Sequence, residues 1–123
     1  MRRRARFRLA HPRDPSCHSV AHGLRLGAVE IRQTSEFSRW LTRMEDKRAR
    51  GLVEVRIRRL SLGLPGDVRP IGEGVSELRI DFGPGYRVYF CQRGQVLVIL
   101  LIGGDKRTQA RDIRTALRLA REL

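Results

Sequence analysis

The sequence predicts an α+β fold, in which a small antiparallel β-sheet is flanked by an N-terminal αα-hairpin and a C-terminal helix. Three observations lead to this prediction. Apolar residues recur at helical spacing in two consecutive segments between residues 35 and 62. Short strand-like segments separated by Gly and Pro turns follow, up to residue 102. A last helical pattern runs to the C-terminus, which gives the order β-α-α-β-β-β-β-α.

The first predicted elements are a strand and a helix. Val29–Arg32 is expected to form a short strand, and either Thr34 or Ser35 offers an N-cap for the helix after it. One face of this helix carries apolar residues at positions i, i+3, i+4 and i+7, namely Phe37, Trp40, Leu41 and Met44. We therefore expect Trp40 to lie in the core.

A second helix is expected from about Asp46 to Leu62, so that the two helices form an αα-hairpin. Its apolar stripe consists of Ala49, Val53, Ile57 and Leu60. Basic side chains cover much of the remaining surface, among them Arg58 and Arg59. The sequence Leu64-Pro65-Gly66-Asp67 ends the helix.

Four strands and a helix are expected to complete the chain. The strands are Val68–Ile71, Val75–Phe82, Tyr86–Arg93 and Val96–Ile102. The last strand is apolar on both faces, as in a central strand, and Gly103-Gly104 is expected to end it in a turn. The apolar stripe of the final helix is Ile113, Ala116, Leu117 and Ala120. The apolar faces of helices and sheet are expected to define one core.

Strand alternation places four chemically active side chains on one face of the sheet, which we expect to be exposed: Glu77, Arg79, Arg87 and Tyr89. Arg79 and Arg87 are expected to be neighbours across a hairpin, and two adjacent guanidinium groups favour an anion between them. Two interpretations stay open. The arginines clamp a phosphate, or a solvated Glu77–Arg87 salt bridge is purely structural. Tyr89 is either a base-stacking group and proton donor or a half-buried strand aromatic.

Further cationic side chains are candidates for phosphate contacts. Lys106 and Arg107 are expected to open the last helix, whose N-terminus favours anions. Arg58 and Arg59 on the second helix are additional RNA- or phosphate-binding candidates. Gly83-Pro84-Gly85 lies between two strands and is interpreted as a turn, not as a phosphate-binding loop.

The charge of the chain favours a polyanionic partner. The 123 residues contain 26 Lys and Arg against 13 Asp and Glu, a formal net charge of +13. All the basic residues except Lys47 and Lys106 are Arg, which binds phosphate through two parallel hydrogen bonds and stacks on bases. Codon preference could account for the ratio of Arg to Lys, but it does not account for the net charge.

Several functional classes are disfavoured by the composition. No apolar segment approaches the ~20 residues that span a bilayer, so no membrane partner is expected. Two cysteines, Cys17 and Cys91, are too few for a disulfide framework or a zinc site, which favours a reducing, cytoplasmic location. The histidines all precede residue 29, and no metal-ligating cluster or nucleotide-binding glycine motif occurs, so neither metal nor cofactor is expected.

Residues 1–28 differ from the rest of the chain. They contain seven Arg and one Asp and show no clear strand or helix period. They can be a disordered basic arm, a targeting segment, or translated leader upstream of the true start. We favour the last interpretation, because a compact domain begins naturally at Val29. The expected division is therefore a leader over 1–28 and one compact domain over 29–123.

The domain resembles the RelE/ParE superfamily of type II toxin–antitoxin toxins, in particular its HigB-like "addiction module killer" branch. The matching pieces, in this order, are EFSRWL, GDVRPIGEGVSELRI, GPGYRVYF and GGDKRTQARDI. The resemblance covers residues 29–123. It implies a small antiparallel sheet with an N-terminal helical hairpin and a C-terminal helix, the fold predicted above from residue patterns.

The resemblance also implies an activity and a set of partners. A RelE-like toxin is a ribosome-dependent mRNA endonuclease that directs a ribose 2′-OH at the adjacent phosphate without a metal. It arrests translation in the cytoplasm until an antitoxin neutralises it, typically a helix-turn-helix protein from the adjacent gene. Contact with operator DNA occurs only through that antitoxin.

The resemblance assigns roles to individual residues. The arginine of the family's Gly-Tyr-Arg falls on Arg87, a strand lysine falls on or near Arg79, and basic residues after the glycine pair fall on Lys106 and Arg107. The chain departs from the family where RelE toxins place a catalytic tyrosine, because Ile113 stands there. Its domain also lacks the histidines of some HigB proteins. Glu77 and Tyr89 are therefore the candidates for the general base.

Two alternative functions use the same fold. A ParE-like toxin poisons DNA gyrase by binding and cleaves nothing, and the lack of an obvious general base keeps this alternative open. A non-catalytic nucleic-acid-binding module is the other.

Overall fold

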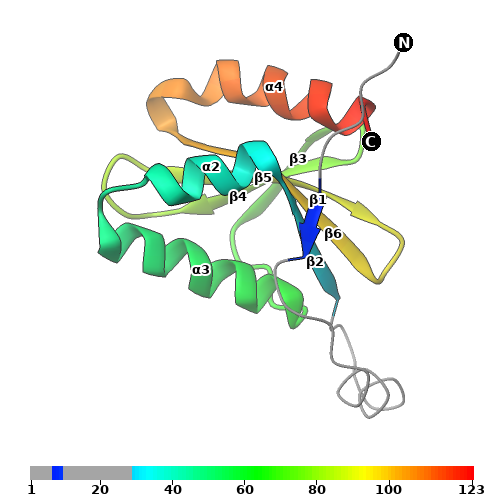
Figure 1. Cartoon of the computed structure of the whole chain (residues 1–123), viewed down its shortest axis with the longest axis horizontal. Helices are drawn as coiled ribbons and strands as arrows, with labels where there is room; N and C mark the ends of the chain where they lie inside the picture. The colour runs from blue at the N-terminus through cyan, green and yellow to red at the C-terminus, as the bar shows by residue number, and fades with distance from the viewer. Residues whose placement is uncertain (1–6, 10–28) are drawn as a thin grey trace.

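The computed structural model describes residues 7–9 and 29–123 and confirms the predicted α+β class (Figure 1). The strands are β1 Phe7–Leu9, β2 Glu30–Thr34, β3 Val68–Gly72, β4 Val75–Ile80, β5 Tyr86–Arg93 and β6 Leu97–Asp105. The helices are α2 Ser35–Arg43, α3 Lys47–Ser61 and α4 Gln109–Arg121, with the short 3₁₀ helix η1 Lys106–Thr108 before α4. From residue 29 onward the order of elements is the predicted one. No helix in the described part of the chain is long and apolar enough to cross a membrane.

The strands form one six-stranded sheet in the order β1-β2-β6-β5-β4-β3. The expectation of a wholly antiparallel sheet is wrong at one place, because β2 pairs with β6 in parallel. The αα-hairpin after β2 carries the chain across the sheet before the antiparallel strands begin, and this long connection permits a parallel pair. Strand β1, which the sequence did not predict, pairs antiparallel with β2. The other predictions for residues 1–28 lie outside the described residues.

Both helices of the αα-hairpin have side-chain N-caps, of which the sequence predicted the one at Thr34. The Thr34 hydroxyl accepts a hydrogen bond from the Phe37 backbone N–H at 3.0 Å and donates to the Leu101 carbonyl at 2.7 Å, so it caps α2 and ties it to the sheet. The Asp46 carboxylate caps α3, accepting from two backbone N–H groups of the first turn at 3.0 and 3.1 Å. The predicted stripe of α3 is buried: Ala49, Val53, Ile57 and Leu60.

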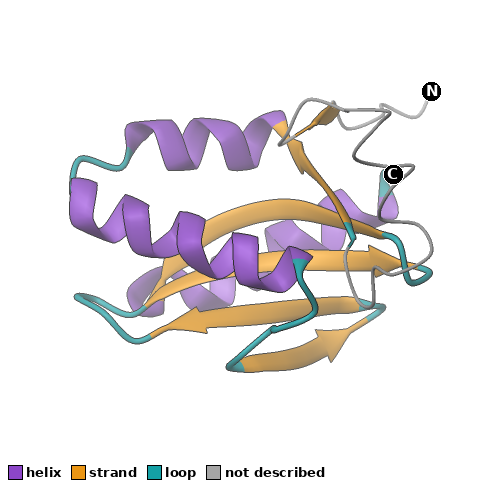
Figure 2. Ribbon diagram, turned by 90° about the horizontal axis from the view of Figure 1, so that it is seen from below, coloured by secondary structure: helices purple, strands orange, loops and turns teal. Residues whose placement is uncertain are grey.

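The sheet separates two apolar cores, where the sequence predicted one. Helices α2 and α3 pack on one face, over side chains such as Leu78, Val88 and Leu100. Helix α4 packs on the other face, and its Leu119 contributes to a second core with Tyr89. Figure 2 shows these layers, with the sheet between the αα-hairpin and α4. The sheet face that the sequence predicted to be exposed is therefore covered by α4.

Gly103 and Gly104 are strand residues and do not form the predicted turn, since β6 continues to Asp105. A Cβ atom on Gly103 would collide with the Trp40 ring, and a Cβ atom on Gly104 would collide with the Asp112 carboxylate. The two glycines thus allow a helix to approach the strand closely on each face of the sheet. Trp40 is partly buried against the first core, as its helical position predicted.

Candidate active site

A cavity of about 350 Å³ opens where the ends of β4 and β5 meet the start of η1. Three cationic side chains line it: Arg79, Arg87 and Lys106. Its other lining residues are Asp67, Ile80, Asp81, Gly85 and Tyr86. The sequence predicted a cationic site from these two strands and the segment after β6, and the structure brings one residue of each into the same cavity.

Arg79 and Arg87 lie directly opposite each other in the β4–β5 ladder, as strand parity predicted. Arg79 keeps about a third of its side chain exposed (30%), whereas that of Arg87 is almost fully buried (5%). The backbone of Arg79 is fixed from the αα-hairpin side, because the Arg56 guanidinium donates to its carbonyl at 2.9 Å. Both guanidinium groups therefore contribute charge to the cavity, and that of Arg79 is the more accessible to solvent.

The side chain of Arg87 is held by the turn before it. Its Nη1 donates to the Gly85 carbonyl at 2.9 Å. Its Nε is buried, lies 3.4 Å from a Glu77 carboxylate oxygen and makes no hydrogen bond. Gly85 has a φ of 82°, and a Cβ there would come within 3.4 Å of Arg87 Nη1 and 3.5 Å of Lys106 Cβ. These are ordinary contact distances, so the turn needs glycine for its backbone conformation.

Glu77 and Tyr89 are buried, contrary to the predicted exposure, with 2% and 0% of their surface accessible. The Tyr89 hydroxyl donates to Glu77 Oε2 at 2.9 Å, and Gln109 of α4 donates to the same oxygen at 2.9 Å. Burial, together with this hydrogen bond, raises the pKa of Tyr89 far above its usual range, so the phenol stays protonated. Neither residue lines the cavity. The predicted Glu77–Arg87 ion pair does form, but it is buried and not solvated.

Lys106 and Arg107 lie in η1 and not in the last helix. The Asp105 carboxylate occupies the start of η1, accepting from the Arg107 backbone N–H at 2.8 Å and pairing with its guanidinium at 3.1 Å. The helix N-terminus that was expected to attract a phosphate therefore already holds a carboxylate. Lys106 lines the cavity, whereas Arg107 lies outside it with its side chain 80% exposed.

Arg58 and Arg59 do not join the cavity. Both are exposed on α3, which packs on the sheet face opposite to α4. The structure thus separates these two predicted phosphate contacts from the cationic cluster.

Sequence analysis missed three of the lining residues that carry chemistry: Asp67, Asp81 and Tyr86. Asp81 follows Arg79 by two positions and Tyr86 precedes Arg87, so both flank the Gly83-Pro84-Gly85 turn. Their position at strand ends beside the arginines is the sequence feature that could have pointed to the cavity. For Asp67 the sequence feature is weaker, because a tertiary contact brings this residue to the cavity. Its carbonyl accepts a hydrogen bond from the Arg79 backbone N–H at 2.9 Å. Two carboxylates therefore face three cations in this cavity.

A second buried carboxylate network lies beneath the end of β6. The Thr108 hydroxyl donates to Asp112 on α4, and Arg111 approaches the same carboxylate at 3.8 Å. Burial raises the pKa of Asp112, while the hydrogen bond from Thr108 opposes that shift. Within residues 7–9 and 29–123, no three side chains of His, Cys, Asp or Glu are grouped so that they could hold a metal ion.

Comparison with known proteins places the chain in a family. Residues 39–123 match the family described as phage derived protein Gp49-like (DUF891), and the chain belongs to this family, which is of the toxin–antitoxin addiction-module killer type. A protein of Haemophilus influenzae described as uncharacterized is 47% identical over 95 residues, which make up 77% of this chain and 96% of that protein. No solved structure matches the chain. The family implies an antitoxin as partner.

Proposed function

We propose that the protein is a HigB-like toxin of the RelE/ParE superfamily and that it cleaves mRNA on the ribosome in the cytoplasm. The observation that carries this proposal is the convergence of Arg79, Arg87 and Lys106 on one cavity. Three cations around a space of about 350 Å³ suit a phosphodiester, whose negative charge increases in the transition state of cleavage.

In the proposed reaction a ribose 2′-oxygen attacks the adjacent phosphorus, and the bond from phosphorus to the 5′-oxygen of the next nucleotide breaks. Arg79 and Arg87 stabilise the charge on the non-bridging oxygens. The Lys106 ammonium group donates a proton to the leaving 5′-oxygen. The products are a cyclic phosphate on one fragment and a free 5′-hydroxyl on the other.

The proton of the 2′-hydroxyl requires an acceptor at the cavity. Asp81 and Asp67 are the carboxylates that line it, so we propose one of them as general base, with Asp81 preferred because it lies on the same strand end as Arg79. Glu77 and Tyr89 act as positioning residues in this proposal, because they are buried and do not line the cavity. Glu77 pairs with both cavity arginines, with Arg87 at 3.4 Å and with Arg79 at 3.9 Å, and Tyr89 donates to Glu77.

The proposal is tested by inducing the full chain in bacteria and mapping the 5′ ends of messenger RNA. New 5′ ends inside coding sequences are expected, together with growth arrest. Replacing Arg79 and Lys106 together (R79Q/K106Q) is expected to lower the cleavage rate on the order of 100-fold or more, since the first removes charge stabilisation and the second removes the proton donor. Asp81→Asn tests the general base in the same assay.

Arg114→Gln is the control for each single replacement of that pair, because Arg114 is exposed on α4 and does not line the cavity. It removes one positive charge without touching the site and is expected to keep full activity. Equal loss of activity in this control would mean that overall charge matters and the cavity does not. Growth arrest with intact messages and stalled replication would contradict cleavage.

That last outcome would favour the ParE-like alternative, a toxin that binds gyrase and cleaves nothing. One observation supports this alternative: the two residues predicted as general bases, Glu77 and Tyr89, are buried away from the cavity. The same outcome would leave Asp81 and Asp67 without a catalytic role.

A further inference from the structure

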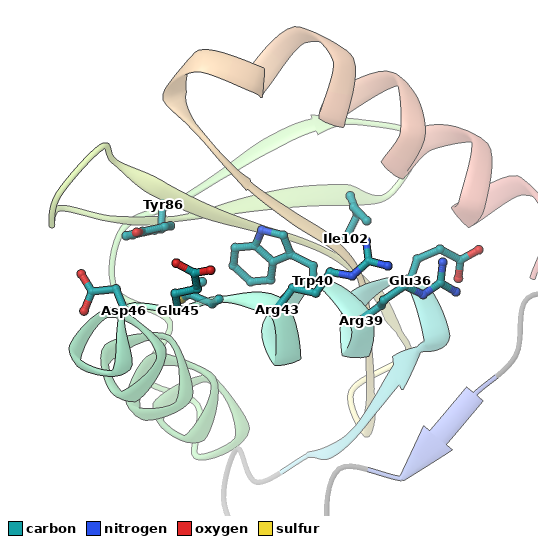
Figure 3. A pocket seen from close by; sticks show the side chains of 9 residues that line it. Glu36, Arg39, Trp40, Arg43, Glu45, Asp46, Tyr86 and Ile102 are labelled. Atoms are coloured by element: carbon teal, nitrogen blue, oxygen red, sulfur yellow. The ribbon is translucent and has the colours of Figure 1, made fainter.

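A second and larger hollow lies beside the cationic cavity, on the αα-hairpin side of the sheet. Its volume is about 620 Å³, which is within the range of sites for small organic groups. The indole of Trp40 lies near its middle, with Tyr86 toward one end, as Figure 3 shows. Ile102 of β6 also lines it. The hollow therefore combines two aromatic rings with an aliphatic side chain.

The Trp40 ring is fixed in this hollow by the fold. It packs against Phe37 with 5.5 Å between ring centroids and an interplanar angle of 47°. Its other contact is the backbone of Gly103, where any Cβ atom would collide with the ring. A ring that is held in place loses little conformational freedom when a planar ligand stacks on it.

Tyr86 joins the two sites, since it lines both the hollow and the cationic cavity. It is the first residue of β5, directly after the Gly83-Pro84-Gly85 turn and directly before Arg87. The cavity and the hollow therefore meet at the Tyr86 side chain. A strand whose phosphate lies in the cavity has the hollow as a neighbouring space for its base.

The polar rim of the hollow suits a base more than a second phosphate. Arg39, Arg43 and Glu36 line it from α2, and the carboxylates of Glu45 and Asp46 line it from the α2–α3 loop (Figure 3). Two cations against three carboxylates give the rim no positive field that would attract a second phosphate. Carboxylates accept from base amino groups, and guanidinium groups donate to base carbonyls or stack on the ring.

The geometry points to a nucleobase-binding site: the hollow holds a base of the RNA strand whose phosphate occupies the cationic cavity, stacked on Trp40 and Tyr86. This inference rests on the proposed RNA-binding function and adds to it a subsite for the base. Stacking on aromatic rings tolerates all four bases, so the subsite supplies affinity and places the strand.

The test uses Trp40, the only tryptophan of the chain, whose emission therefore reports on this hollow alone. The full chain is titrated with a short 2′-O-methyl oligoribonucleotide, which cannot be cleaved, and with the same strand lacking its bases. We expect quenching of Trp40 emission by the intact strand only, and binding of the intact strand on the order of tenfold tighter or more.

Tyr86→Leu is expected to remove most of the difference between intact and abasic strands, while Arg114→Gln keeps it. If Tyr86→Leu does not fold, the comparison of the two strands on the unchanged chain decides alone. Equal binding of both strands with unchanged Trp40 emission would overturn the inference and leave the cationic cavity intact. Quenching with the intact strand but no cleavage of messages would support the base site and contradict only the proposed activity.

The hollow could instead receive a protein segment. Poly-glutamate is the probe for that outcome, since an acidic chain complements the charge of the protein. A change of Trp40 emission with poly-glutamate and none with the intact oligonucleotide would make the hollow a protein-docking site and overturn the inference.

Discussion

At Arg87 a guanidinium group lies almost fully buried, 3.4 Å from the carboxylate of Glu77. Glu77 in turn accepts hydrogen bonds from Tyr89 and from Gln109, so the pair is anchored to both the sheet and α4. The removal of one member of such a buried pair leaves the other charge uncompensated. A loss of activity after replacement of Arg87 alone would therefore not distinguish unfolding of the protein from removal of a site residue. For this reason the function is tested at Arg79 and Lys106.

A double-mutant cycle measures this coupling. Arg87→Met and Glu77→Gln are each expected to lower the free energy of unfolding by about 3 kcal/mol, because each leaves a buried group without its partner. The double variant is expected to lose less than the sum of the two, by at least about 1 kcal/mol. Denaturant titration followed by circular dichroism measures all four proteins.

Glu73→Gln is the control for this cycle. Glu73 forms hydrogen bonds with Arg121 at 2.6 and 2.8 Å, but the pair is exposed and solvent screens its charges. Its replacement is expected to change stability little. Additive effects of Arg87→Met and Glu77→Gln would show that the two buried side chains do not interact in solution.

At the scale of elements, two glycines act in opposite ways. Gly51 lies in the middle of α3, and a Cβ there would meet nothing within 4 Å. Gly104 lies in β6, and a Cβ there would collide with Asp112 and come 2.9 Å from the Thr108 hydroxyl. The first glycine only weakens its helix, whereas the second permits α4 to lie against the sheet.

The same substitution is therefore expected to have opposite signs at these two sites. Gly51→Ala should raise the free energy of unfolding by about 0.5–1 kcal/mol, because alanine is the better helix former. Gly104→Ala should lower it by about 2 kcal/mol or more, because the methyl group overpacks the junction with α4. Thermal and denaturant unfolding of both variants measure the difference, and a harmless Gly104→Ala would contradict the described packing of α4.

At the scale of the whole molecule, the charge of the chain far exceeds what the cavity uses. The formal net charge is +13, yet three cations line the candidate site. Arginines outside it, such as Arg58 and Arg59, lie on a different face and could bind RNA only diffusely. The dependence of RNA binding on salt separates the two cases, because each phosphate contact releases counterions.

If RNA binding is dominated by the three cations of the cavity, a plot of the logarithm of affinity against the logarithm of salt concentration should have a slope of about −2 for a short oligoribonucleotide. Each phosphate contact of a single strand contributes about −0.7 to this slope. R79Q/K106Q should lower the steepness by about 1 to 1.5. Arg58→Gln, the control, should leave the slope unchanged. A much steeper slope that is indifferent to R79Q/K106Q would mean diffuse binding.

Local patterns were sufficient to predict the features that depend on neighbouring residues alone. Helical periods located α2 and α3, and a predicted N-cap marked the start of α2. Strand parity placed Glu77, Arg79, Arg87 and Tyr89 on one sheet face. Periodicity cannot tell which side of a sheet a distant helix will cover, because that choice depends on contacts between residues far apart in the chain. Only the tertiary structure could decide that α4 buries Glu77 and Tyr89.

The composition of the site was likewise settled only by tertiary structure. Arg79, Arg87 and Lys106 converge because β4, β5 and the end of β6 are neighbours in the sheet. Tyr86 and Asp81 enter the site because strand ends leave side chains free to turn toward a cavity. The sequence identified candidate cations, whereas the packing of α4 decided which of the predicted residues line the cavity and which are buried behind it.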